Sequence, residues 1–408
     1  MTTRLPHPSW VFLILAVLVC LNSNGQRGHA AEVERLSFHA DGTMYQTSNG
    51  QAFQAGGWNW GHWGMTLPGD AQLHVSEGAN IVRIILRWWG LYGGSGIDAY
   101  DDGAPGHINA TNLALLDQMI QWCADAHLWI NLAVDSNCGQ NGMQNPQTEA
   151  YCNISGVPAQ NFWNNLGMRA KFKEVWTFVA SRYKNVSRIA WYEILPEPSP
   201  PPPATNADVS EFYQEMIPVL RAVDPITPIL IGPNGGYSAP LIATVYNSSY
   251  TNVVYTADFL DPVMRNTSNL LGKLNYLIAL RNATGAPMFI QQAGDTIVSD
   301  PNATALAAGL QILINNKVGF TGWEYRGPSY YSYSVWWENG TQWSLKTIPY
   351  DVYLSKFASW STPLNSSTSS TTISSSTSTS SSTAATHKAS IAAVLTFFVC
   401  ALALMLLY

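Results

Sequence analysis

The chain has 408 residues, of which 26 are Asp or Glu and 20 are Lys or Arg, giving a formal net charge of −6. This balance excludes a general electrostatic attraction to nucleic acid or to another anionic surface. Charged residues make up only 11% of the sequence while Trp and Tyr number 16 and 19, a composition that suits neutral ligands such as sugars.

Residues 1–30 predict a cleaved secretory signal peptide. An uncharged apolar run at 11–21 follows a single charge at Arg4, and a polar stretch with small residues ends near Ala30. The run is too short to span a bilayer and lies at the amino terminus, which is the pattern of a signal peptide. A buried first helix is the alternative. We therefore expect the chain to enter the secretory pathway.

Residues 31–362 predict an α/β fold of one domain. Strand-like runs, rich in β-branched and aromatic residues, lie at 54–58, 81–85, 128–134, 189–195, 228–231, 252–256, 287–291 and 319–325. Amphipathic stretches such as 113–126 and 209–223 separate them. Strands that alternate with helices form parallel βαβ units, and eight units favour a closed (β/α)8 TIM barrel. The sequence has neither a dinucleotide-binding glycine motif nor a metal-ligand cluster, so we expect no cofactor and no metal.

The cysteines and sequons agree with secretion. Cys138 and Cys152 bracket a polar loop, and we predict that they form a disulfide, which an oxidising compartment permits. Cys123 lies in an amphipathic segment and is expected to be a buried free thiol. Nine Asn-x-Ser/Thr sequons predict a glycoprotein; they begin at Asn109, Asn153, Asn185, Asn247, Asn266, Asn282, Asn302, Asn339 and Asn365.

The carboxyl-terminal part predicts attachment to a membrane. Residues 363–386 are rich in Ser and Thr, which cannot form a core and are typical of a solvated stalk. Residues 387–408 begin with His387 and Lys388 and continue as an apolar stretch. Small residues, a polar spacer and an apolar tail form the pattern of a GPI-anchor signal, here with Ser382 as the attachment site. The prediction is a protein anchored to the outer face of the plasma membrane, and a single transmembrane helix is the alternative.

In a TIM barrel, functional side chains lie at the carboxyl ends of the strands. The candidates at those ends are Trp58, Trp60, Asp135, Glu197, Asp258, Gln292 and Trp323.

Four segments, in order along the chain, resemble the family 5 glycoside hydrolases. They are 57–63 (GWNWGHW), 80–83 (NIVR), 131–142 (NLAVDSNCGQNG) and 183–198 (YKNVSRIAWYEILPEP). The resemblance implies cellulase-like, retaining hydrolysis of a β-glycosidic bond by two carboxylates about 5 Å apart. Glu197 matches the carboxylate that acts as acid and then as base, and Arg83 matches the family's active-site arginine.

The active-site positions depart from the family in several places. Gln292 stands where the nucleophilic glutamate is expected, and a neutral amide cannot form the glycosyl ester. Pro196 replaces an Asn that would hold the 2-hydroxyl of the sugar. Asp258 lies where the family has His-x-Tyr, and Asp135 lies at a histidine position. These substitutions predict a degenerate hydrolase, a pseudoenzyme with weak or no activity.

Three functions stay open on the sequence alone. The first is the degenerate hydrolase, which would bind a β-linked polysaccharide or oligosaccharide through Arg83, Trp58, Trp60, Asp135, Asp258 and Trp323. The second is an active O-glycosyl hydrolase of β-glucanase or mannanase type, in which another carboxylate works with Glu197. The third is a non-catalytic surface or adhesion scaffold. A carboxylate close to Glu197 would favour the second function, and a filled cleft would favour the third.

Overall fold

The computed structural model describes the chain from Val33 to Phe357 with gaps. The described residues are 33–61, 66–87, 110–135, 163, 166–200, 205–235, 238–260, 263–295, 302–327, 333–339 and 342–357. The expected signal peptide, the Cys138–Cys152 disulfide, the stalk and Ser382 lie outside these residues and stay predictions. Within the described part of the chain, no helix combines the length and the apolar character that crossing a bilayer requires.

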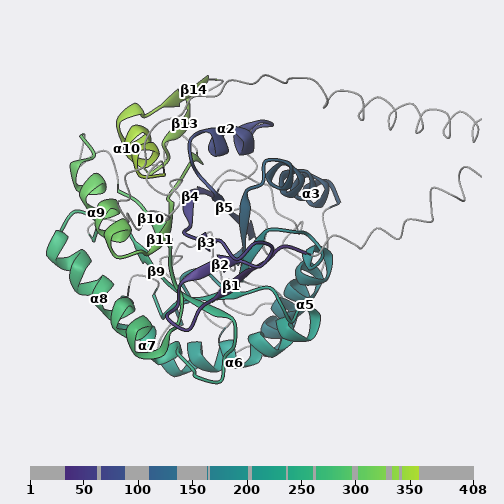
Figure 1. Ribbon diagram of the computed structural model, residues 1–408. Coiled ribbons are helices and arrows are strands. Elements are labelled where there is room, and N and C mark those ends of the chain that lie inside the picture. The colour runs from purple at the N-terminus through teal and green to yellow at the C-terminus, as the bar shows by residue number, and fades with distance from the viewer. Residues whose placement is uncertain are drawn as a thin grey trace, which may run out of the picture. The chain divides into compact units, whose positions relative to one another are not determined.

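Eight parallel strands close into a barrel, which confirms the predicted fold (Figure 1). The strands are β4 (Gly56–Trp60), β5 (Ile81–Arg87), β6 (Trp129–Asp135), β7 (Ile189–Glu193), β8 (Ile229–Ile231), β9 (Val253–Phe259), β10 (Met288–Ala293) and β11 (Gly319–Gly322). They follow one another around the barrel in sequence order, with β11 pairing with β4 to close it. Their side chains are buried on both faces, as is usual for parallel strands covered by helices.

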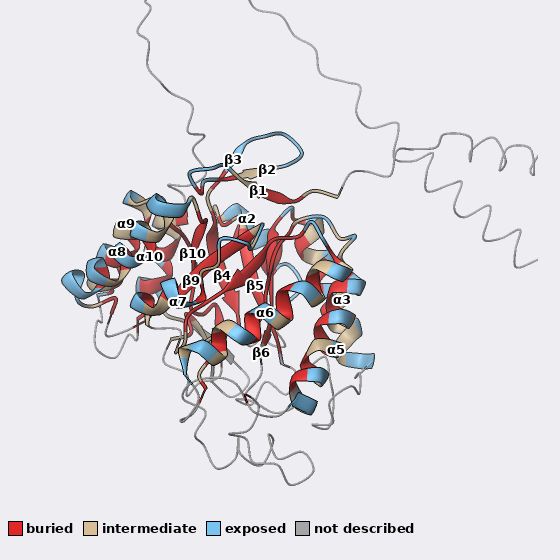
Figure 2. Cartoon of the chain, turned by 90° about the horizontal axis from the view of Figure 1, so that it is seen from below, coloured by how far each residue is buried: buried red, intermediate tan, exposed pale blue. Residues whose placement is uncertain are grey.

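A ring of helices surrounds the barrel, and the buried side of each helix is turned towards the strands (Figures 1 and 2). The helices are α2 (Asp70–Ser76), α3 (Ala110–Asp125), α5 (Leu166–Tyr183), α6 (Asn206–Val223), α7 (Ile242–Val245), α8 (Thr267–Thr284), α9 (Thr304–Asn315) and α10 (Thr347–Phe357). The short 3-10 helix η4 (Ala239–Leu241) precedes α7. The sequence sets these boundaries locally: Thr205 and Asp208 form a capping box at the start of α6. Gly285 ends α8 in a left-handed conformation, where a Cβ would lie 2.0 Å from the carbonyl oxygen of Ala40.

A small antiparallel sheet covers the end of the barrel where the strands begin. It consists of β1 (Leu36–Phe38), β2 (Met44–Gln46) and β3 (Ala52–Phe53), and Figure 2 shows it at one end of the barrel. Its apolar side chains pack against first residues of the barrel strands, such as Ile81 and Trp129. The opposite end, where the strands finish, is where TIM barrels carry their functional residues, and the candidate site lies there.

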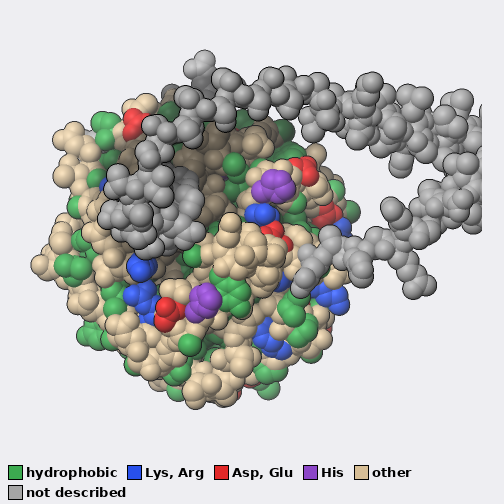
Figure 3. Space-filling view, in the orientation of Figure 1, with side chains coloured by type: hydrophobic (Ala, Val, Ile, Leu, Met, Phe, Trp, Pro, Cys, Tyr) green, Lys and Arg blue, Asp and Glu red, His purple; other side chains and the backbone are tan. Residues whose placement is uncertain are grey.

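A second small sheet follows the barrel. It contains β12 (Arg326–Gly327), β13 (Trp336–Asn339) and β14 (Gln342–Leu345). On the face that Figure 3 shows, charged side chains are scattered among hydrophobic and neutral ones, as the low content of charged residues leads one to expect.

Candidate active site

Strand β4 has three residues with side chains, Trp58, Asn59 and Trp60, and only Asn59 turns into the barrel. The Oδ1 atom of Asn59 accepts a hydrogen bond from Arg83 (2.8 Å), and its Nδ2 donates to the carbonyl of Gln291 (2.8 Å). Because successive side chains of a strand point to opposite faces, Trp58 and Trp60 point outward. The Trp58 ring lies 4.7 Å from that of Tyr353 in α10, and Trp60 donates its indole N–H to His74 in α2 (3.1 Å).

This arrangement corrects the expected substrate-binding role of the two tryptophans. Trp58 is 0% exposed and Trp60 is 1% exposed, both between the barrel and its helices. Neither ring reaches the barrel mouth. The signal in the sequence was the alternation of side chains along a strand. If Asn59 points into the barrel, its two neighbours must point outward.

Arg83 and Glu193 form a buried ion pair at the centre of the barrel. Two guanidinium nitrogens of Arg83 each lie 2.6 Å from an oxygen of Glu193, and Asn131 donates a third hydrogen bond to that carboxylate (2.8 Å). Burial alone would lower the pKa of Arg83, but the Glu193 carboxylate outweighs this effect and raises it. Arg83 therefore lies inside the barrel, bonded to Glu193 and Asn59, while Asn131 bonds Glu193; these three residues were not among the predicted site residues.

Glu197 lies just beyond β7 and meets Gln292 at the end of β10. The Nε2 atom of Gln292 donates a hydrogen bond to Oε1 of Glu197 (3.1 Å). Glu197 has a φ of 45°, a left-handed conformation that is costly for a residue with a Cβ and that recurs at functional sites. A register shift in β10 between Phe289 and Gln292 places Gln292 opposite Asp258 of β9. The positions expected for the acid/base and the nucleophile are therefore adjacent in space.

Asp258 is buried beside Glu197. Asp258 is 0% exposed, and within the described structure no N–H or hydroxyl group donates to its carboxyl oxygens. It lies opposite Gln292, whose amide donates to Glu197, so the two carboxyls are neighbours. Burial and then repulsion from Glu197 raise the pKa of Asp258 well above its usual range. Burial also raises the pKa of Glu197, although the hydrogen bond with Asp258 and the charge of Arg83 oppose this.

Two other acidic side chains near the strand ends, those of Asp295 and Glu324, accept hydrogen bonds from other residues. Asp295 accepts a hydrogen bond from Arg265 (2.7 Å), and Glu324 accepts one from Ser334 (2.8 Å). Asp135 ends β6 opposite Arg87, but its side chain is outside the described part of the structure. In the residues that are described, no group of His, Cys, Asp and Glu could hold a metal ion.

Among the tryptophans that the structure describes, Trp323 lies near the barrel mouth. It is 9% exposed and packs with Ile85, Ala133 and Leu260, side chains near the finishing ends of the strands. The guanidinium of Arg83 lies 6.0 Å from the centroid of the Trp323 ring. Trp323 therefore stays a candidate for stacking against a bound sugar.

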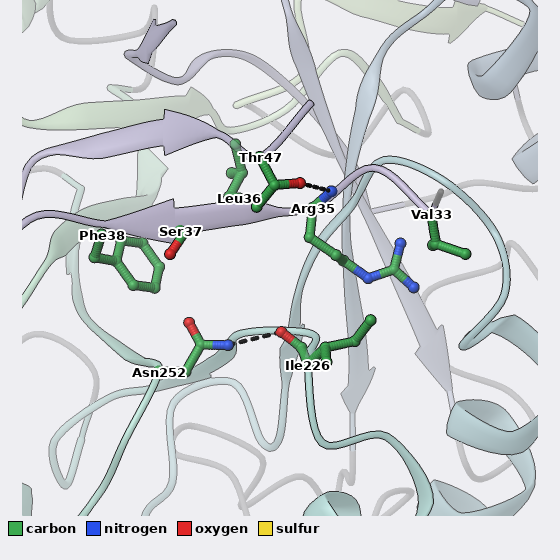
Figure 4. A pocket seen from close by; sticks show the side chains of 8 residues that line it. All are labelled: Val33, Arg35, Leu36, Ser37, Phe38, Thr47, Ile226 and Asn252. Atoms are coloured by element: carbon green, nitrogen blue, oxygen red, sulfur yellow. Dashed lines mark hydrogen bonds between the residues drawn. The ribbon is translucent and has the colours of Figure 1, made fainter. Parts of the chain in front are cut away.

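A shallow groove lies at the end of the barrel where the strands begin, and its polar side chains serve to hold neighbouring segments together. It has a volume of about 500 Å³ and lies beside β1 (Figure 4). Its polar groups bond to one another or to the backbone: Thr47 accepts from the Arg35 amide (3.0 Å), and Asn252 donates to the carbonyl of Ile226 (2.7 Å). The guanidinium of Arg35 is buried and bonded to Thr227 (2.7 Å). This groove therefore offers a ligand few unsatisfied groups.

Comparison with known families agrees with the fold and the strand-end motifs. The family model for cellulases (glycosyl hydrolase family 5) matches residues 45–329. Endoglucanase E-5 of Thermobifida fusca is 27% identical over 160 residues, which are 36% of this chain and 31% of that protein. A probable glucan 1,3-beta-glucosidase A of Neosartorya fischeri is 26% identical over 175 residues, 42% of this chain and 37% of that protein. The chain thus spans about a third of the length of these curated relatives.

Solved structures share the barrel. Cel5A of Thermotoga maritima, in a complex with mannotriose, has a TM-score of 0.55 and 15% identity over 74% of this chain and 97% of that one. Endo-glycoceramidase II from Rhodococcus sp., in a cellobiose-like imidazole complex, has a TM-score of 0.53 and 15% identity over 74% of this chain and 79% of that one. At these identities the likeness establishes the fold.

Proposed function

The chain belongs to the cellulase family (glycosyl hydrolase family 5), and from this we propose that it is a member that binds β-linked polysaccharide but cleaves it poorly. The observation that carries the proposal is the hydrogen bond from the Gln292 amide to Glu197. The Gln292 amide stands at the position expected for the nucleophile, and it donates a hydrogen bond to Glu197, the expected acid/base residue. Without a carboxylate there, the covalent glycosyl intermediate of the retaining route cannot form.

The β-linked substrate class is supported by the relatives. Curated proteins with partial similarity are named as an endoglucanase and a probable glucan 1,3-beta-glucosidase. Structures with the same fold contain mannotriose and cellobiose. We therefore propose β-linked glucose or mannose polymers as the ligands to test first, contacted at Arg83, Trp323 and the Glu197–Asp258 pair.

The second candidate is an active O-glycosyl hydrolase that uses Glu197 together with Asp258. The raised pKa values of these two carboxyls favour it, because a carboxyl whose pKa lies above its usual range can act as an acid closer to neutral pH. It requires the two carboxyls to lie about 5 Å apart for a retaining route or more than about 6 Å apart for an inverting route.

The test measures binding and turnover separately. Purified chain is titrated calorimetrically with cello-, laminari- and manno-oligosaccharides, and the same sugars are assayed for release of reducing ends. We expect weak binding with negligible turnover. Robust turnover by the wild-type chain that Glu197→Gln abolishes would contradict the proposal of a poorly active member and favour the active O-glycosyl hydrolase. Absence of binding to every glycan would favour the non-catalytic adhesion scaffold.

We further propose that the protein is displayed on the outer face of the plasma membrane by a GPI anchor at Ser382. The pattern of residues 363–408 motivates this proposal. Phosphatidylinositol-specific phospholipase C should release the protein from intact cells. If the protein stays bound and its mature form still contains Met405, the tail is a transmembrane helix instead.

A further inference from the structure

The backbone around Trp323 is fixed to neighbouring elements of the fold. The Trp323 amide donates to the carbonyl of the last residue of β10 (2.9 Å), and the Tyr325 amide donates to the carbonyl of Asn59 (3.0 Å). Arg326 then forms a buried ion pair with Asp70 of α2, with 2.8 Å between Nη2 and Oδ1. The segment that carries the Trp323 ring is therefore held on both sides of the ring.

Gly61, the residue after β4, leaves room for this ring. A Cβ at position 61 would lie 2.6 Å from Cη2 and 2.9 Å from Cζ3 of Trp323, and 2.5 Å from Oε2 of Glu324. Carbon atoms that are not bonded to each other prefer a separation of about 3.5–4.0 Å. The backbone of Gly61 lies outside the left-handed region. Space, and not backbone conformation, is therefore what requires glycine at this position.

A methyl group at position 61 would displace the ring rather than the groups around it. Glu324 is buried, and its other carboxyl oxygen accepts a hydrogen bond from Ser334 (2.8 Å). Gly294, just after β10, supports the Trp323 backbone: a Cβ there would lie 2.6 Å from the Trp323 carbonyl oxygen, so the two backbones are already in close contact. The Trp323 ring can turn about its own side-chain bonds, and it is therefore the part that gives way.

We propose that Gly61 is a positioning residue for glycan binding, because its lack of a side chain sets the orientation of the Trp323 ring at the barrel mouth. This inference rests on the proposed glycan-binding function and names a residue that acts on that site through the ring. A ring stacks on a sugar through many weak contacts, and a gap of about 1 Å already removes about half of the energy of each contact. A ring that a methyl group has turned aside would therefore bind the sugar more weakly.

The first measurement follows the ring itself and needs no ligand. Gly61→Ala is compared with Gly272→Ala, a matched control in α8, where a Cβ meets no atom within 4 Å. The purified chains are labelled with fluorotryptophan, and the fluorine resonance of Trp323 is identified by its loss in Trp323→Phe. We expect Gly61→Ala to shift the Trp323 resonance and Gly272→Ala to leave it unchanged.

The second measurement is affinity. The unlabelled chains are titrated calorimetrically with cellotetraose and with the mannose and laminari oligomers of the same length. Gly61→Ala should weaken binding about fivefold, as the loss of one aromatic contact in Trp323→Ala does, and Gly272→Ala should not change it. In the Trp323→Ala background, Gly61→Ala should cause no further loss, because the ring through which it acts is absent. A general structural defect would instead weaken binding in both backgrounds.

A second background keeps the test decisive if Gly61→Ala folds poorly. The phenyl ring of Trp323→Phe lacks Cη2 and Cζ3, the two ring atoms that a methyl group at position 61 would meet. Gly61→Ala should therefore lower the urea midpoint of unfolding more in the wild-type chain than in Trp323→Phe.

Each outcome decides a different point. An unmoved Trp323 resonance, or an affinity loss that persists in full without the Trp323 ring, overturns this inference and leaves the proposed function intact. A folding defect of Gly61→Ala that Trp323→Phe does not reduce overturns it as well. If the wild-type chain binds none of the sugars, the proposed function fails, and the role of Gly61 in binding fails with it even where the resonance moves.

Discussion

Gln292 at the end of β10 donates a hydrogen bond to Glu197, just beyond β7, with 3.1 Å between Nε2 and Oε1. Asp258, opposite Gln292 on β9, is a second carboxyl beside Glu197, and burial and then the charge of Glu197 raise its pKa. A neutral amide at position 292 is therefore compatible with two neighbouring carboxyls, because it adds a donor and no charge. A carboxylate at position 292 would be a third acidic group in the same place.

Gln292→Glu should recover little hydrolysis. The new carboxyl has nearly the same volume, but repulsion from Glu197 and Asp258 would raise its pKa and weaken it as a nucleophile. The double variant Pro196→Asn with Gln292→Glu should hydrolyse faster than Gln292→Glu alone. Asn supplies a side-chain partner for the sugar's 2-hydroxyl, and that hydrogen bond strengthens in the transition state. The effects should be non-additive because both act on one transition state. Release of a fluorogenic aglycone measures the activities.

Gln292→Met is a neutral control that separates the loss of the amide donor at position 292 from the gain of a negative charge there. Gln292→Met removes the hydrogen bond to Glu197 without adding a carboxyl and should cost about 1–2 kcal/mol of unfolding free energy. Gln292→Glu should be less stable than Gln292→Met at neutral pH and should regain stability as the pH falls. Hydrolysis by Gln292→Glu alone at the rate of an ordinary cellulase would contradict this account of the site.

Asp258 should give the stability of the protein a distinct pH dependence. Burial raises the pKa of its carboxyl in the folded state, so the folded protein holds a proton that the unfolded chain loses above about pH 4. The stability that this proton contributes is fully present below the unfolded pKa and is lost as the pH rises through the folded pKa. Asp258→Asn removes the titration, so the variant should gain relative to wild type as the pH rises, by about 1.4 kcal/mol for each unit of pKa shift.

Urea unfolding at a series of pH values measures this difference, and Asp117 provides a control of opposite sign. The hydrogen bond from Arg182 lowers the pKa of Asp117, so its contribution to stability is lost as the pH falls. Asp117→Asn should therefore lose relative to wild type at neutral pH and match it at low pH. Parallel curves for wild type and Asp258→Asn would mean that Asp258 does not hold a proton in the folded state.

The buried pair of Arg83 and Glu193 should behave as one unit. Arg83→Met or Glu193→Gln alone leaves a buried charge without its partner, which typically costs about 3–5 kcal/mol. The double variant Arg83→Met with Glu193→Gln should cost less than the sum, and a double-mutant cycle on unfolding free energies measures the coupling. The exposed pair Arg182 and Asp117 should show coupling below about 1 kcal/mol in the same assay. Additive losses at Arg83 and Glu193 would contradict their direct dependence on each other.

The sequence predicted the barrel and the strands that bear the site, but it did not determine which side chains meet there. Alternating strands and helices are local patterns, and Arg83 and Glu197 lie in recognisable segments. The nearness of Glu197 and Asp258 brings the segment after β7 to the end of β9, and the contact of Gln292 with Glu197 depends on a register shift in β10. Both depend on closure of the barrel, which no local pattern encodes.

The wrong expectation for Trp58 and Trp60 has a related cause. In a strand, a change of one position moves a side chain to the opposite face, so nearness to a strand end does not determine its direction. Glu193 ends β7, but only its contacts with Arg83 and Asn131 reveal that it anchors the site.

Trp58 and Trp323 should separate stability from ligand binding. Trp58 is fully buried against α10, so Trp58→Ala should cost about 3–5 kcal/mol of unfolding free energy. Trp58→Phe should cost less and leave affinity for glycans unchanged in the folded protein. Trp323→Ala removes a ring at the barrel mouth and should weaken glycan binding about fivefold, which corresponds to ~1 kcal/mol for one aromatic contact. Urea unfolding and calorimetric titration with an oligosaccharide that binds wild type measure the two quantities on the same preparations. Affinity that falls in Trp58→Phe and persists in Trp323→Ala would place the glycan away from the barrel mouth and against the helix layer.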